Sequence, residues 1–338
     1  IEKLRTKALT DIMQEQGIPG IFALAKKEII QREIGPLLVS NILTDKQIEE
    51  IILQCLRTSL DYDGLLIGML RSSKDKRKTI YMKLRSKITE DEALRLLLLS
   101  PYRTATWNLV DQLSAEARSR YWVEVVPQYI FDSPDENNES VRRLLEVERP
   151  RAAFTSIQYK LKEIHPPLLV QMLSAIAEKS RDKAGEYKPD EYYVRLAFQL
   201  IDLNPELTVE EKVGLEFTYI EVLTRPFRGK DQQQIPNLEL YIEEHPELFV
   251  RAVVWTYKRG DGGEDPAEFR VREGREYLAQ GGHRLLEAIE RIPGQDQATK
   301  EEQKKKLADW VATVRRSCAE LDRAEIADVC LGKLLSNA

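Results

Sequence analysis

The chain has 338 residues, of which 42% are hydrophobic and 32% charged, and its formal net charge is -5. No stretch approaches the roughly 20 consecutive apolar residues of a membrane-spanning helix, which excludes a transmembrane protein. Glycine is sparse and apolar residues recur throughout, which excludes collagen-like and disordered chains. The composition therefore predicts a globular chain that folds in water and is long enough for more than one domain.

The acidic balance also argues against a generic nucleic-acid coat protein. The three cysteines, Cys55, Cys318 and Cys330, are too few and too scattered for a disulfide framework. We therefore expect a cytoplasmic protein. The sequence starts at Ile1 without an initiator methionine or a signal peptide, so we also expect a chain truncated at both ends.

Apolar residues recur with helical spacing along most of the chain. Between Thr44 and Leu60 they fall three or four positions apart, so they form one stripe opposite the charged positions. Three helix starts carry the capping-box pattern, in which a threonine is followed three residues later by Glu or Gln. The pairs are Thr44 with Gln47, Thr89 with Glu92, and Thr208 with Glu211.

The same spacing predicts further helices in chain order. They lie near residues 2–16, 19–27, 30–41, 63–72, 75–87, 90–99, 104–113, 115–129, 138–147, 150–163, 167–182, 189–203, 209–224, 237–244, 247–258, 270–291, 301–321 and 324–336. The best strand candidate, Trp122–Ile130, is flanked by helical patterns, and no hairpin turn joins two strand-like runs. The predicted fold class is all-α.

Short polar connections favour antiparallel neighbours stacked in sequence order. About eighteen short helices stacked in this way form a degenerate, HEAT-like solenoid, since no clean repeat period is present. The predicted parts are an N-terminal array at 1–130, a central array at 131–258, a linker at 259–268 and a C-terminal helical segment at 269–338.

Catalytic motifs are missing from the sequence. The Gly229-Lys230 pair is followed by Asp231 and lacks the upstream glycine of a phosphate-binding loop, and neither G-x-S-x-G nor H-E-x-x-H occurs. No ligand-type spacing joins His283 to the cysteines around a metal ion. We therefore predict no catalytic residue, no cofactor and no metal.

Two features leave a weaker enzymatic interpretation open. His165 and His245 each precede a proline, which is typical of a helix boundary. Glu216 lies in an apolar helical stretch, where it is either a buried ion-paired carboxylate or part of an unrecognised site near His245.

The main charge feature is the basic segment, residues 71–87, in which Asp75 is the single acid. Tyr81 and Met82 lie within it, which would allow stacking on bases beside phosphate contacts. Contact with nucleic acid, contact with an acidic protein surface, and a plain solvated helix face all remain open. The candidate partner-binding residues are Arg71, Lys74, Lys76, Arg77, Lys78, Lys83, Arg85 and Lys87.

Aromatic residues at helical spacing are more typical of a core than of a ligand site. We expect core positions for Trp107, Tyr121, Trp122, Tyr192, Tyr193, Phe198, Phe249, Trp255 and Tyr257.

Several stretches together suggest a family. They are Leu99–Trp107, Tyr121–Trp122, Arg142–Glu146, Arg149–Ala153, Leu215–Tyr219, Glu244–Phe249, Arg275–Leu286 and Trp310–Leu335. This pattern of helix-packing residues resembles the C-terminal helical region of large bacterial multidomain proteins of the phage-defence type, behind effector or NTPase modules. The resemblance carries no catalytic motif and implies no functional residue.

These observations lead to one principal expectation of function. The chain is expected to be a non-enzymatic helical scaffold or sensor arm that contacts a protein partner or other domains of its own longer chain. The alternative is a nucleic-acid-contacting helical domain that uses the basic segment. No membrane partner is expected.

Overall fold

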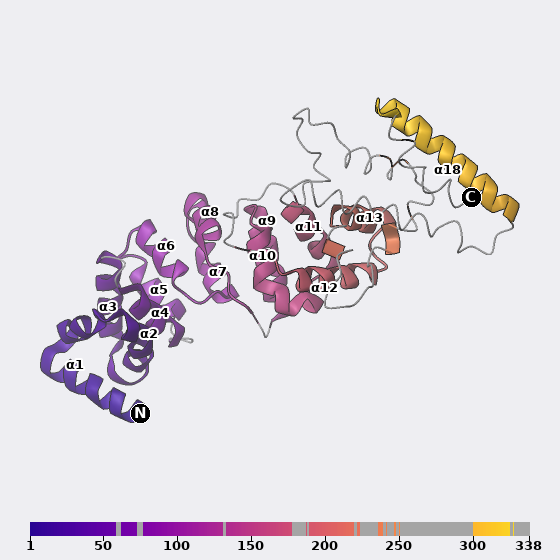
Figure 1. Ribbon diagram of the computed structural model, residues 1–338. Helices are drawn as coiled ribbons and strands as arrows, with labels where there is room; N and C mark the ends of the chain where they lie inside the picture. Colours follow the sequence, from indigo (N-terminus) through magenta and orange to yellow (C-terminus); the bar gives the residue numbers. More distant parts are fainter. Residues whose placement is uncertain are drawn as a thin grey trace. The chain divides into compact units, whose positions relative to one another are not determined.

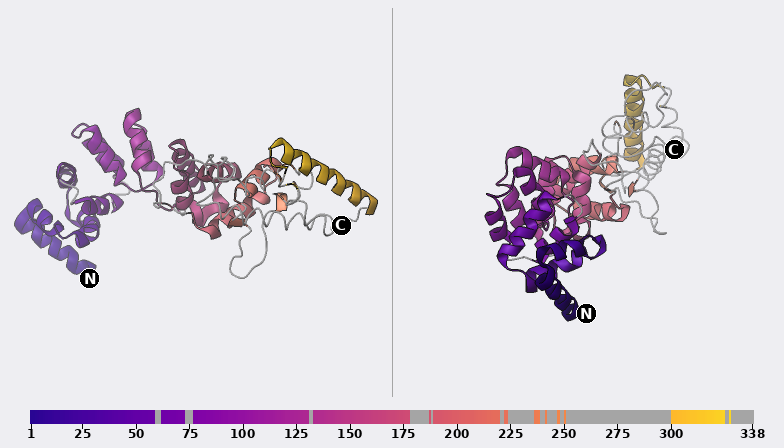
Figure 2. Two further views of the ribbon diagram at one scale, coloured as in Figure 1. Left: turned by 45° about the horizontal axis from the view of Figure 1, so that its top comes forward. Right: turned by 90° about the vertical axis from the view of Figure 1, so that its left-hand side faces the viewer.

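The computed structural model describes residues 1–58, 62–72, 77–130, 133–177, 187, 189–219, 222–223, 236–238, 241, 247, 250, 300–324 and 327. Within these residues every regular element is a helix, so the all-α prediction is confirmed (Figure 1). The views in Figure 2 show the same helices from two further sides. The expected linker at 259–268 and the expected helix at 270–291 lie outside the described residues.

The chain divides into two compact units, residues 1–147 and 148–338. The first unit contains α1 (Glu2–Ala25), α2 (Glu28–Leu37), a π-helical turn η1 (Leu38–Ile42), α3 (Asp45–Arg57), α4 (Asp63–Ser72), α5 (Arg77–Leu84), α6 (Glu90–Leu98), α7 (Thr104–Val110), α8 (Ala115–Glu124) and α9 (Pro134–Glu146). In the second unit the described elements are α10 (Pro150–Ile157), a 3-10 helix η3 (Gln158–Glu163), α11 (Pro166–Ala177), α12 (Glu191–Asp202), α13 (Val209–Thr218) and α18 (Lys300–Glu320).

All three predicted capping boxes are present, at the starts of α3, α6 and α13. At α6 the backbone N–H of Thr89 donates to Glu92 Oε2 at 2.7 Å, and the N–H of Glu92 donates to Thr89 Oγ1 at 3.2 Å. Each box satisfies two backbone donors that have no partner inside the helix, and a cap of this kind stabilises a helix by about 0.5–2 kcal/mol.

Some helix boundaries differ from the predicted ones for local reasons. The two helices expected at 2–16 and 19–27 form one element, α1, which has a kink at Gly17. The φ angle of Gly17 is 63°, a value that is accessible mainly to glycine. The helix expected at 115–129 ends at Glu124, because Pro127 disfavours helical geometry at the residue before it. The helix expected at 138–147 begins earlier, at Pro134, because Ser133 Oγ accepts the N–H of Glu136 as its N-cap.

Helices α2 and α4 cross closely at two glycines. A Cβ built on Gly35 would lie 2.6 Å from the backbone N of Met69, and one built on Gly68 would lie 3.0 Å from the carbonyl oxygen of Arg32. Distances this short leave no room for a side chain on Gly35. The two backbones therefore touch at this crossing, in the manner of small-residue helix contacts.

A buried glutamine joins the same two helices one turn away. The Gln31 side chain is buried, and its Nε2 donates to the carbonyl of Ala25 at 2.8 Å. Its Oε1 accepts the N–H of Leu65, in the first turn of α4, at 3.2 Å. The glutamine thus satisfies a backbone donor at the start of α4, which no intrahelical partner could do.

Substitution of Gly35 by alanine should lower the free energy of unfolding by about 1–3 kcal/mol, because the new methyl group must push the backbones of α2 and α4 apart. Gly214 in α13 is the matched control, since a Cβ there meets nothing within 4 Å. Gly214→Ala should stabilise the protein by up to about 1 kcal/mol through helix propensity. Urea unfolding midpoints measure both effects, and equal midpoints for the two variants would contradict the close crossing.

Candidate functional site

The basic segment begins at the end of α4 and continues through α5 toward α6. One face of α5 carries the buried residues Ile80, Tyr81 and Leu84, which anchor it on the unit. Arg71 and Lys78 are exposed, whereas Arg85 is half-buried. Lys74, Lys76 and the side chain of Arg77 lie outside the described part of the structure.

Two lysines of the segment pair with acids of α3. Lys87 Nζ lies 2.9 Å from Glu49 Oε2, and Lys83 Nζ lies 3.5 Å from Glu49 Oε1 and 3.7 Å from Asp45 Oδ2. The hydrogen bond from Lys87 holds the pKa of Glu49 below its ordinary value. These two cations are therefore matched within the chain itself.

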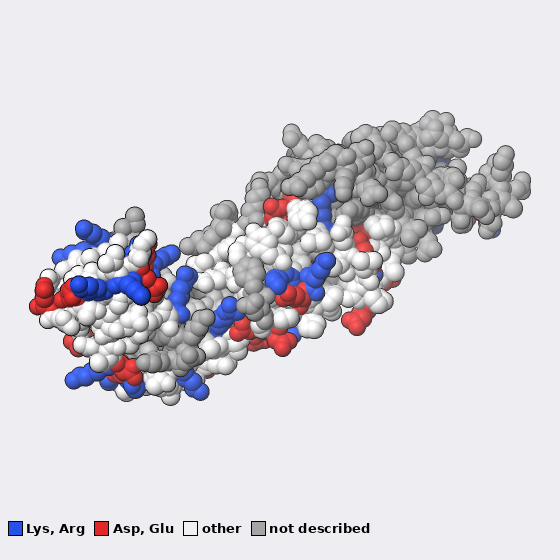
Figure 3. All heavy atoms as spheres, turned by 90° about the horizontal axis from the view of Figure 1, so that it is seen from below, with Lys and Arg blue, Asp and Glu red and all other residues white. Residues whose placement is uncertain are grey.

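Charges of both signs are interspersed over the described surface that faces the viewer in Figure 3. Such an arrangement produces weaker long-range fields than a surface of one sign, because the fields of neighbouring opposite charges largely cancel at a distance, and salt screens the remainder beyond roughly 8–10 Å. The basic segment is less electropositive in the fold than its residue count suggests, because Lys83 and Lys87 are paired with acids of α3.

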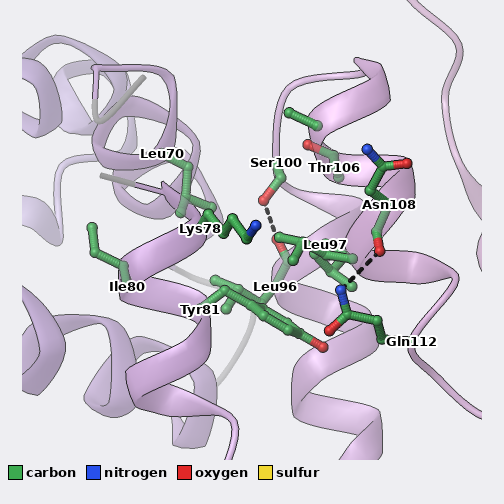
Figure 4. A pocket seen from close by; sticks show the side chains of 12 residues that line it. Leu70, Lys78, Ile80, Tyr81, Leu96, Leu97, Ser100, Thr106, Asn108 and Gln112 are labelled. Atoms are coloured by element: carbon green, nitrogen blue, oxygen red, sulfur yellow. Dashed lines mark hydrogen bonds between the residues drawn. The ribbon is translucent and has the colours of Figure 1, made fainter. Parts of the chain in front are cut away.

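A cavity of about 230 Å³ lies beside α5, between α4, α6 and α7. Most of its wall is apolar, and Lys78 supplies the one charged side chain among the described residues that line it. Figure 4 shows Lys78 and Tyr81 projecting from α5 toward the helices opposite. The lining residues are Leu70, Lys78, Ile80, Tyr81, Leu96, Leu97, Ser100, Ala105, Thr106, Asn108, Leu109 and Gln112.

Tyr81 is among the residues that line this cavity, but its hydroxyl is buried away from it. The residue is only 2% exposed, and its hydroxyl oxygen, which has almost no accessible surface, has no hydrogen-bond partner among the described residues. Burial raises the pKa of the phenol above its ordinary value. A buried hydroxyl without a partner costs about 1–3 kcal/mol of stability.

The aromatic core predicted for the first unit is confirmed. Trp107, Tyr121 and Trp122 are buried together with Tyr102, and the Trp107 and Trp122 rings lie 5.6 Å apart. The guanidinium of Arg143 lies over the Trp122 ring at 5.3 Å.

The second unit carries a cluster of partly exposed tyrosines, Tyr159, Tyr192 and Tyr193, here named the tyrosine cluster. The Tyr193 ring meets Tyr159 at 5.2 Å and Tyr192 at 5.1 Å between centroids, both edge to face. Tyr159 is 52% exposed and Tyr192 is 47% exposed.

The expectation of a core position for Tyr192 is therefore wrong. Helix α12 buries the face that holds Val194, Phe198 and Ile201, as predicted for Phe198. Tyr192 lies on a different face, in the first turn of the helix. The sequence contains one indication of this exposure, because the spacing of Tyr192 from Val194, Phe198 and Ile201 does not match the helical repeat of that buried face. Phe249, Trp255 and Tyr257 lie outside the described residues.

Glu216 in α13 is completely buried and accepts three hydrogen bonds. The N–H of Leu238 donates to its Oε2 at 2.5 Å, while the backbone and side-chain nitrogens of Asn237 donate to its Oε1 at 3.2 and 2.6 Å. The same Asn237 amide donates to Asp202 Oδ1 at 2.9 Å. Burial raises the pKa of Glu216 to about 7 and raises that of Asp202. These bonds tie Asn237 and Leu238 to α13, and they satisfy the buried carboxyl group.

The raised pKa makes stability depend on pH. Between the ordinary pKa of 4.5 and about 7 the native state keeps a proton on Glu216 that the unfolded chain has lost, so the free energy of unfolding falls as pH rises through this range and then levels off. The fall is on the order of 3 kcal/mol.

Glu216→Gln should remove most of this slope, because the amide reproduces the neutral acid and keeps an acceptor for Asn237. The exposed Glu210 of the same helix is the control, and Glu210→Gln should retain the parent's slope. Urea titrations between about pH 5 and 8 measure the difference. A Glu216→Gln variant that keeps the full slope would refute the assignment of the titration to this residue.

The remaining candidates for chemistry are histidine and cysteine side chains in the part of the chain that the structure describes. No group of three or more His, Cys, Asp or Glu side chains there could hold a metal ion. Burial raises the pKa of Cys55 to about 12, which leaves the thiol protonated. His165 lies directly before α11, as predicted for a helix boundary, and its carbonyl accepts the N–H of Leu168 at 2.9 Å.

His245, His283 and Cys330 lie outside the described residues. No helix among the described residues is long and apolar enough to cross a membrane. No family model, curated protein or solved structure matches the chain.

Proposed function

We propose that the chain is a non-enzymatic helical scaffold or sensor arm that makes protein–protein contacts, within a larger bacterial protein of the phage-defence type. In this proposal its helices continue as a degenerate, HEAT-like solenoid of about eighteen. The packing of α10 on α11, α11 on α12 and α12 on α13 supports this arrangement in the second unit, since each helix contacts its successor. The link to defence proteins is supported by the resemblance of the helix-packing residues.

The observation that carries the proposal is the tyrosine cluster. Tyrosine is among the residues most enriched at interface hot spots, because a rigid ring supplies a large contact area and its hydroxyl a hydrogen bond. In the cluster the Tyr193 ring braces both Tyr159 and Tyr192, so the exposed rings are already held in place. A partner that covered them would lose little side-chain entropy on binding.

The features of α5 favour a protein partner over nucleic acid. A nucleic-acid groove combines unpaired cations with aromatic rings exposed for stacking. Here Lys83 and Lys87 are paired with Glu49, and the Tyr81 ring is buried inside the unit. The exposed Arg71 and Lys78 are suited to an acidic patch on a protein, where they would act mainly on the association rate.

Site-specific photo-crosslinking tests the proposal. With benzoylphenylalanine in place of Tyr192 or Tyr159 in the full-length protein inside its own cells, irradiation should yield a discrete cross-linked product with a protein or with another segment of the same chain. The first ring of the probe takes the place of the tyrosine ring, and its benzoyl group replaces the hydroxyl and extends outward, where these half-exposed positions leave room for it.

Leu203 provides the matched control, because it is 82% exposed, belongs to the same unit and lies outside the cluster. The probe at Leu203 should give no product beyond the background of random collisions. If the Tyr192 and Tyr159 positions gave no more product than Leu203, the tyrosine cluster would not be a contact surface and the proposal would fail.

A further inference from the structure

Two carboxyl groups, one on α12 and one on α13, share a single amide donor. The side-chain nitrogen of Asn237 donates to Asp202 Oδ1 at 2.9 Å and to Glu216 Oε1 at 2.6 Å. Asp202 also accepts a hydrogen bond from the Glu216 side chain. Because an ionised carboxylate can only accept, a bond between two carboxyl groups requires one of them to hold a proton. The two acids therefore share one proton in this arrangement.

Glu216 is the member of the pair that keeps the proton. Its side chain is completely buried, whereas Asp202 is half-buried. Burial disfavours the charged form of Glu216, and the charge of Asp202 disfavours it further. Lys212 Nζ donates to the backbone carbonyl of Asp202 at 2.9 Å, and its positive charge favours the ionised form of that residue. The bonds thus fit a neutral Glu216 that donates to an anionic Asp202.

Among the described residues, Lys212 is the cation that acts on this pair. Helix α11 packs on both α12 and α13 and carries no titratable residue, and residues 236–238 carry no charge. The 3-10 helix η3 packs on α12, and its charged residues are one exposed lysine and the Lys160–Glu163 pair. Arg195 lies two turns before Asp202 on α12 and donates to a backbone carbonyl. The other acids of α12 and α13 lie in the first turns of these helices; they are Glu191, Glu210 and Glu211.

We propose that Asp202, Glu216 and Asn237 form a proton-dependent clamp, which fastens residues 236–238 to α12 and α13 while the carboxyl pair holds one proton and loosens when that proton is lost. Loss of the proton places a second anion beside Asp202 and removes the bond between the carboxyl groups. Detachment of residues 236–238 then admits water, which solvates the new charge on Glu216. The clamp is independent of the tyrosine cluster and of the function proposed for it.

The direction of the pH effect follows from the two states of the clamp. The pKa of Glu216 is about 7 in the closed clamp and returns toward its ordinary value of 4.5 when water reaches the side chain. The closed state is therefore most favoured below the lower value, weakens as the pH rises, and levels off above the higher value. Between pH 5 and 7 the equilibrium constant for opening should rise roughly 40-fold.

Hydrogen exchange of the Leu238 amide measures this opening, because the amide donates to Glu216 Oε2 in the closed clamp. Its protection factor, which corrects for the intrinsic pH dependence of exchange, should fall roughly 40-fold between pH 5 and 7 in the 338-residue chain. Protection of Leu238 should also be smaller than that of the buried Phe198 amide in α12, because the clamp opens without unfolding the helix.

Two isosteric variants separate a shared proton from the titration of Glu216 alone. Glu216→Gln supplies a permanently neutral donor to Asp202, so protection of Leu238 should change by less than about three-fold over this pH range. Asp202→Asn removes the second charge and supplies a donor to an ionised Glu216, so the change should fall below about ten-fold. Glu210→Gln, which removes an exposed acid of the same helix, should keep the full change.

Three results would overturn the clamp. Protection of Leu238 that is independent of pH in the parent chain would mean that no proton controls this attachment. Protection equal to that of Phe198 would mean that residues 236–238 detach only when the unit unfolds. The full change in Asp202→Asn would mean that Glu216 titrates alone. Retained protection of Phe198 in both variants verifies that they fold.

Discussion

The contact between the backbones of α2 and α4 sets the arrangement of the first unit. At Gly35 and Gly68 neither helix has a side chain to hold the other away, and one turn along the buried Gln31 bonds to both the end of α1 and the start of α4. Close-packed backbones leave little freedom for sliding or rotation. The last turn of α4, including Leu70, is therefore fixed where it forms part of the wall of the cavity beside α5.

The local features of the fold could be predicted from sequence, because they depend on residues a few positions apart. The threonines at 44, 89 and 208, each with its Glu or Gln partner, marked three helix starts correctly. The crossing at Gly35 and Gly68 could not be predicted in this way. An isolated glycine in a helical pattern indicates only reduced helix propensity, and its partner lies in another helix.

For the candidate sites, too, local sequence patterns identified the residues but not their tertiary contacts. The sequence identified the basic segment, yet it could not reveal that Glu49 would neutralise two of its lysines, since that pairing depends on how α3 packs against α5. It located Tyr81 but suggested stacking on bases, whereas the fold buries both the ring and the hydroxyl. Glu216 was recognised as unusual from its apolar neighbours, but its partners Asn237 and Leu238 follow from the tertiary fold.

The two units differ in the features that they carry. The first unit has a small, mostly apolar cavity beside α5. The second presents the tyrosine cluster on its exterior, which suits a protein partner.

The central claim is that the tyrosine cluster is covered when the protein works, and oxidative footprinting measures this most directly. Hydroxyl-radical labelling with mass spectrometry would compare the purified 338-residue chain with the full-length protein in its native assembly. The account predicts that Tyr159 and Tyr192 are strongly oxidised in the purified chain and protected in the assembly, while Leu203 reacts equally in both. Equal oxidation of the two tyrosines in both samples would contradict the claim.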